Sequence, residues 1–143
     1  MRVVAPLALL PALLAAHPHV FVDATVEVVV EAGAVTGMRI AWTYDDLFSL
    51  MLTEDLGIDG DGDLVLTDAE TATLLESVAD WPPDYAGDLV VEAGDAPLPL
   101  ADREDHGVAF DDGAVVETHR RPLVQPAAVT TAPVLVKVFD PYY

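Results

Sequence analysis

The sequence predicts an α+β domain in which antiparallel β-hairpins form a sheet or a small sandwich, with two helices inserted after the second strand. Apolar and polar residues alternate along most of the chain, which is typical of half-buried strands. Helical spacing is confined to residues 45–81. Because no internal repeat and no glycine- or serine-rich linker interrupts this pattern, we expect residues 17–143 to form one domain.

The first two strands are expected to pair as a hairpin. Alternate residues from Val20 to Val30 are apolar, whereas Thr25 and Glu27 between them are polar, so that one face of this strand is expected to be buried. A turn at Ala32-Gly33 leads into a second alternating segment over residues 34–44.

The first helix is predicted over about residues 45–56. Leu47, Leu50, Met51 and Glu54 recur at helical intervals, and Gly57 is a suitable residue to end the helix.

The second helix is predicted from Thr67 to near Trp81. Its inward residues are expected to be Leu74, Leu75 and Val78, and it must stop where two prolines follow Trp81.

The remainder of the chain predicts further antiparallel strands separated by turn residues. These segments are 87–94, 96–100, 106–110, 114–121 and 133–139.

The N-terminal residues are typical of a secretory signal. Arg2 precedes an apolar run that is too short and too rich in proline to span a membrane, and Ala15 and Ala16 are small, as cleavage sites require. We therefore expect cleavage after Ala16, a periplasmic location and no membrane anchor in the processed chain.

Charge and composition exclude several classes of function. Loss of residues 1–16 removes Arg2 and leaves five basic side chains against 25 acidic ones, which opposes nucleic-acid binding. The chain contains no cysteine, so thiolate metal sites, thioredoxin-like redox chemistry and cysteine nucleophiles are excluded. Such an excess of acidic side chains favours the binding of cations, but it is also typical of proteins adapted to saline surroundings.

Two histidines around a proline follow the expected cleavage site. His17 would offer its free amine and its imidazole to a transition metal, and His19 would add a third nitrogen. Because Pro18 has no amide proton, the site could not use a deprotonated backbone nitrogen there and would depend on the imidazoles.

A fourth donor could come from His106, His119 or a carboxylate, although both of these histidines lie among charged residues and are expected to be solvated. Two other interpretations of the opening histidines remain. They could be a polar junction without a tertiary role, or the copper site of a polysaccharide monooxygenase, which the 7% aromatic content does not favour.

The loop between the predicted helices resembles a calcium-binding loop. Carboxylates stand at its positions 1, 3, 5 and 12, where hard oxygen ligands are needed. They belong to Asp59, Asp61, Asp63 and Glu70. Position 6 is Leu64, where a sharp turn normally requires glycine.

The loop could instead be a degenerate calcium loop or a merely acidic connector, and two features of the sequence bear on this choice. A register that starts two residues earlier places Gly62 at the turn, but then Gly57 replaces the first carboxylate. Thr67 and Glu70 also match a capping box, which would engage the Glu70 carboxylate at the start of the second helix.

Several segments together resemble a known family. They are "HPHVFVDA", "WTYDDLFS", "DLGIDGDGDL", "VADWPPDYAGDLVVEAGDAPLPL" and "VKVFDPYY". The chain is similar to an uncharacterised exported family with a domain of unknown function, described as the periplasmic component of an ABC-type transport system and often encoded beside nickel/cobalt permeases.

This resemblance implies a periplasmic accessory protein that binds nickel, cobalt or zinc for transport across the inner membrane. His17 and His19 match the family's opening motif, the implied partner is a membrane metal permease or ABC-type transporter, and no enzymatic reaction is implied. The alternative function is a calcium-stabilised exported structural or interaction module organised by the acidic loop.

Overall fold

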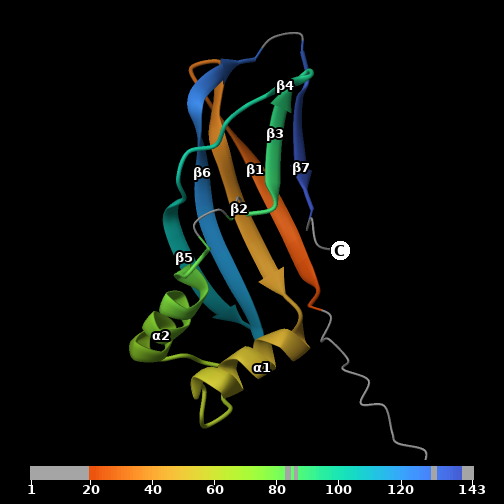
Figure 1. Ribbon diagram of the computed structural model, residues 1–143. Helices are drawn as coiled ribbons and strands as arrows, with labels where there is room; N and C mark the ends of the chain where they lie inside the picture. The colour runs from red at the N-terminus through yellow and green to blue at the C-terminus, as the bar shows by residue number, and fades with distance from the viewer. Residues whose placement is uncertain (1–19, 83–84, 86, 130–131, 140–143) are drawn as a thin grey trace, which may run out of the picture.

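The computed structural model describes residues 20–82, 85, 87–129 and 132–139 (Figure 1). The predicted α+β class is confirmed, with two helices that follow the second strand. The expected leader, His17 and His19 lie outside the described residues. The elements in chain order are β1 (Val22–Glu31), β2 (Ala34–Tyr44), α1 (Asp46–Leu56), α2 (Asp68–Ala79), β3 (Leu89–Ala93), β4 (Ala96–Pro97), β5 (Glu104–Asp111), β6 (Ala114–Ala128) and β7 (Val134–Val138).

The strands form two antiparallel sheets. A four-stranded sheet has the order β1-β2-β6-β5, and a three-stranded sheet has the order β4-β3-β7. Figure 1 shows α1 and α2 at one end of the long strands β2 and β6. The main hydrophobic core joins the two sheets, because Met38 and Ile40 of β2 belong to the same buried cluster as Leu89 and Val91 of β3.

Strand β6 is longer than the segment expected from the sequence. It continues beyond residue 121 to Ala128 and passes through Pro122, which lies opposite Gly37 where the β2–β6 register shifts. Gly37 permits this close approach, since a Cβ there would lie 2.8 Å from the Arg121 carbonyl oxygen. Conversely, the strand expected over 96–100 is reduced to the two residues of β4 and an isolated bridge at Leu100.

The prediction that one face of β1 is buried is largely wrong. Val22, Val28 and Val30 are exposed, and only Val26 and Val29 are half-buried. Strand β1 is an edge strand of the larger sheet, so it has only β2 as a hydrogen-bonding neighbour. A bulge between Val29 and Val30 also interrupts the alternation.

The two helices use their apolar residues differently. Leu74 of α2 is fully buried with Ile58 and Val115 in a second core cluster, as its spacing predicted. In α1, however, the buried residues are the hydroxyl-bearing Ser49 and Thr53. The apolar residues whose spacing predicted α1 therefore face solvent.

Ser49 provides a test of this inverted packing. Its Oγ accepts a hydrogen bond of 2.9 Å from the backbone N–H of Val115 inside the protein. We expect Ser49→Ala to lower the free energy of unfolding by about 1 to 3 kcal/mol, because the buried N–H of Val115 loses its acceptor. Urea denaturation of this variant should be compared with that of Ser77→Ala, which removes an exposed hydroxyl from α2 and should change the free energy by less than about 0.5 kcal/mol. Equal effects of the two substitutions would contradict this role of Ser49.

Candidate functional site: an acidic loop and a buried glutamate network

The loop between α1 and α2 brings three of the predicted metal ligands together. One carboxylate oxygen each from Asp59, Asp61 and Asp63 can be chosen so that all three lie within 4.8 Å of one another. Asp59 is half-buried, and the other two are exposed. Three hard oxygen donors that converge on one point form the type of ligand set that calcium prefers.

The backbone of the loop distinguishes between the two registers. Leu64 adopts a left-handed conformation with φ of 62°, and its N–H donates a 3.2 Å hydrogen bond to Oδ1 of Asp59. Gly62 is also left-handed, with φ of 70°. The shifted register would need a first ligand from Gly57, which has no side chain. The gathered carboxylates therefore favour the register that begins at Asp59, with leucine in the strained turn position.

Glu70, the fourth predicted ligand, is engaged by the backbone. Its Oε2 accepts hydrogen bonds of 2.9 Å from the Thr67 N–H and 2.7 Å from the Thr67 hydroxyl, and Oε1 accepts one of 3.0 Å from the Asp59 N–H. These bonds, chiefly that from the Thr67 backbone, lower the pKa of the Glu70 carboxyl. The capping box is thus present. Glu70 also borders a surface depression of about 480 Å³, together with Asp61 and Asp63.

The N-terminal ligands His17 and His19 lie outside the described residues, so the structure does not place them. The chain just after them is held against the start of α1. The Phe21 N–H donates a 2.7 Å hydrogen bond to Oδ2 of Asp45. The Phe21 carbonyl oxygen in turn accepts a 3.0 Å hydrogen bond from the Asp45 N–H. Asp45 also caps α1 by accepting from the Phe48 N–H, and these backbone bonds lower the pKa of its carboxyl.

A second polar cluster, which the sequence did not predict, lies inside the protein around Glu117 of β6. Its side chain is 1% exposed. Oε1 is 2.9 Å from Nε2 of His106 and accepts a 3.2 Å hydrogen bond from Arg103, while Oε2 accepts one of 3.2 Å from the Tyr44 hydroxyl. We call these four residues and His119 the glutamate network.

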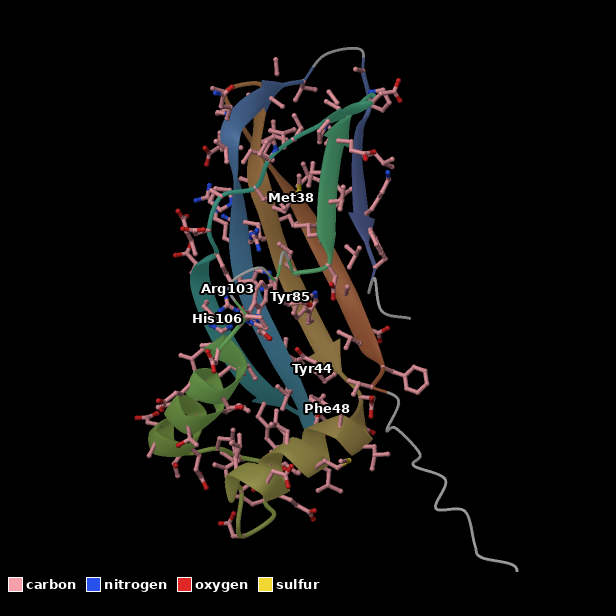
Figure 2. The ribbon with its side chains drawn as sticks, viewed as in Figure 1. Met38, Tyr44, Phe48, Tyr85, Arg103 and His106 are labelled. Atoms are coloured by element: carbon pink, nitrogen blue, oxygen red, sulfur yellow. The ribbon has the colours of Figure 1, made fainter. Side chains whose placement is uncertain are left out.

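Arg103 joins the glutamate network to the end of α2. One of its guanidinium nitrogens donates a 2.6 Å hydrogen bond to the carbonyl oxygen of Ala79, and the guanidinium lies 3.8 Å from the centre of the Trp81 ring. Figure 2 shows Arg103 and His106 side by side, where the end of α2 meets β5 and β6. Arg103 therefore compensates the charge of Glu117 and also stacks on an aromatic face.

His119 occupies an apolar environment beside this charge. Its side chain is 1% exposed, and both Trp42 and Trp81 approach its ring edge-to-face with centroid distances of 5.2 and 5.0 Å. Its Nδ1 is buried without a hydrogen-bond partner among the described residues and lies 3.9 Å from Oε1 of Glu117. Burial, together with the positive charges of Arg103 and Arg121, lowers the pKa of His119 from 6.5 to about 4.

The expectation that His106 and His119 are solvated is therefore wrong. His119 is buried and His106 is half-buried beside Glu117. A usable signal was present in the alternation of β6, since Glu117, His119 and Arg121 share one face with Val115 and Leu123. Polar residues on an apolar strand face indicate an internal network rather than a solvated edge.

The comparisons with known proteins identify the family. The family model described as "Protein of unknown function (DUF1007)" matches residues 2–143. The chain belongs to this family. No curated protein and no solved structure match it. In the part of this DUF1007 chain that the structure describes, no helix is long and apolar enough to cross a membrane.

The low pKa of His119 predicts how stability depends on pH in this DUF1007 domain. The unfolded chain gains a proton on this imidazole below pH 6.5, but the folded chain does so only near pH 4. His119 should therefore lower the free energy of unfolding progressively as the pH falls from 6.5 to 4, by about 3 kcal/mol in total.

This prediction is tested by urea denaturation of the wild type and of His119→Phe at several pH values. The carboxylates titrate in both proteins, so the difference between them isolates the imidazole. We expect the wild type to lose more stability than His119→Phe over this range, with no change in the difference above pH 7. If the free energies of unfolding of the two proteins changed with pH in parallel, His119 would not titrate as described.

Proposed function

We propose that this protein is an exported metal-binding accessory protein whose acidic loop holds a calcium ion. The observation that supports this proposal best is the convergence of Asp59, Asp61 and Asp63 within 4.8 Å. Three negative charges at this separation repel one another, and a divalent cation among them removes that repulsion. No basic residue occurs between Arg39 and Arg103 in the sequence, so the loop has no neighbour along the chain to neutralise it.

The type of ligand favours calcium over a transition metal at this loop. Carboxylate and carbonyl oxygens suit hard cations, whereas nickel, copper and zinc favour nitrogen or sulfur donors. Because Glu70 serves as a helix cap, the ion would bind through the three aspartates, backbone carbonyls and water. We therefore expect an affinity in the range of about 10⁻⁴ to 10⁻³ M that is found in extracellular modules.

The surroundings of the loop support a stabilising role for the ion. The loop connects α1 to α2 and itself contributes Ile58, which is buried with Leu74 of α2 and Val115 of β6 at one end of the larger sheet. An ion that ties Asp59 at the end of one helix to Asp63 before the next would restrict the separation of the two helices. The protein would then be a calcium-stabilised structural or interaction module.

Calcium should raise the melting temperature of the wild type. At a concentration ten times the dissociation constant, which is about 1 to 10 mM for the affinity expected here, a ligand that binds only the folded state adds about 1.4 kcal/mol to its stability. Asp61→Asn should abolish most of this increase, whereas Asp23→Asn, which removes an exposed carboxylate from β1, should leave it unchanged. A wild type whose melting is insensitive to several millimolar calcium, or an Asp61→Asn variant that responds fully, would exclude the site.

We further propose that His17 and His19 hold the transported ion, which is nickel, cobalt or zinc, for a membrane metal permease or ABC-type transporter. This second role is supported by the histidine-proline-histidine motif and by the nitrogen donors it offers after cleavage at Ala16. The anchoring of Phe21 to Asp45 supports it too, because the motif is then followed immediately by a rigidly attached segment.

The two metal roles can be separated in one set of titrations. The intact mass of the exported protein should correspond to a chain that starts at His17. Combined His17→Ala and His19→Ala substitutions should then abolish the binding of nickel and zinc but preserve the calcium-dependent melting shift, and Asp61→Asn should do the reverse. A different first residue, or unchanged nickel and zinc affinities in the histidine variant, would refute the N-terminal site.

A further inference from the structure

The outer face of α1 is apolar, although nothing in the described protein covers it. Leu47, Leu50 and Met51 are 62%, 54% and 40% exposed. Their spacing of three and four residues places them on one stripe of the helix. The opposite stripe, with Ser49 and Thr53, is buried against the sheet end. We call Leu47, Leu50 and Met51 the outer stripe.

Two contacts show that this orientation of α1 is fixed. The Ser49 hydroxyl accepts the hydrogen bond from the Val115 N–H, and the Phe48 ring packs against Tyr44 with a centroid distance of 5.0 Å. Figure 2 shows Phe48 and Tyr44 together where α1 meets the end of β2. The helix therefore cannot roll to bury the outer stripe without breaking a buried hydrogen bond and an aromatic contact.

A further exposed apolar residue, Phe21, is attached by its backbone to the start of α1. Phe21 is 72% exposed, and its backbone forms two hydrogen bonds with Asp45 at the start of α1. Single exposed apolar residues are ordinary in proteins, but several that adjoin one another indicate an interaction surface.

The charges around the outer stripe specify its partner. Glu54 and Asp55 follow the stripe in the last turn of α1, where the helix dipole disfavours acidic residues, and no basic residue is present in that turn. More widely, residues 40–102 contain 16 acidic residues and no lysine, arginine or histidine. Glu54 and Asp55 therefore do not stabilise α1, and together with Asp46 in its first turn they place negative charge at both ends of the apolar stripe.

We propose that the outer stripe of α1 docks an apolar protein segment flanked by lysine or arginine residues. The partner's apolar side chains would cover Leu47, Leu50 and Met51, and its basic residues would pair with the acidic ends of the helix. A second copy of this chain is disfavoured as the occupant, because it would bring an equally acidic helix against this one. The inference does not depend on metal binding by either proposed site.

The experiment measures binding of three helical probe peptides to the full chain by fluorescence anisotropy. The first peptide has a leucine face flanked by lysines, the second has the same leucine face flanked by glutamates, and the third has lysines but glutamines in place of leucines. We expect only the first to bind well, and we expect its affinity to fall as salt is added.

Two matched variants locate the binding surface. Leu47→Ser, Leu50→Ser and Met51→Ser combined should weaken binding of the leucine-lysine peptide at least tenfold. Val65→Ser, Val124→Ser and Leu135→Ser combined remove three exposed apolar side chains elsewhere and should change it less than twofold. Because all six residues are exposed, circular dichroism should show that both variants keep the fold of the wild type.

Three results would overturn the proposal. Equal binding of the lysine-glutamine peptide would show attraction by charge alone. Undiminished binding of the leucine-lysine peptide by the first variant would show that the outer stripe is not the contact. Sedimentation that revealed a wild-type dimer lost in that variant would identify a second copy as the occupant.

Discussion

The burial of the Glu117 carboxylate is the constraint on which the two halves of this structure depend. A charge removed from water costs several kcal/mol unless it is paired and hydrogen-bonded. The pairing is supplied by Tyr44 from β2, His106 from β5 and Arg103 from the segment that precedes β5. Because these partners come from different parts of the chain, Glu117 can be satisfied only when β2, β5 and β6 have come together.

The same network connects the helices to the sandwich. Arg103 reaches past Glu117 to the Ala79 carbonyl at the end of α2, and its guanidinium stacks on Trp81, which in turn stacks on Trp42 of the sheet with a centroid distance of 5.4 Å. At the other side of the insertion, the Ser49 hydroxyl binds the Val115 N–H. The helical insertion is therefore held at both ends, and the acidic loop between the helices projects from a rigid support.

Local features of the fold could be predicted from the sequence, whereas features that depend on distant partners could not. The first hairpin, both helices and the acidic loop follow from residues that are close in the chain, such as the turn at Ala32-Gly33 and the capping box of Thr67 and Glu70. Glu117 and Tyr44 are 73 positions apart, and no local pattern predicts that they meet. The orientation of α1 could not be predicted either. The spacing of its apolar residues reveals an apolar stripe, but it does not decide which side of the helix packs against the sheet.

The two surfaces that we propose to be functional, the acidic loop and the outer stripe of α1, lie in the same acidic segment of the chain. Arg103 lies in the buried glutamate network, and the residues from 40 to 102 have no basic residue of their own. The helical insertion consequently carries acidic charge that internal ion pairs within this segment do not neutralise. A calcium ion in the loop and a basic segment on α1 would both relieve the same repulsion. Since such interactions extend over about 8 Å at physiological ionic strength, a calcium ion bound in the loop after α1 would reduce the attraction that Glu54 and Asp55 exert on a basic partner. The two proposed sites would therefore be coupled through charge even though they use different side chains.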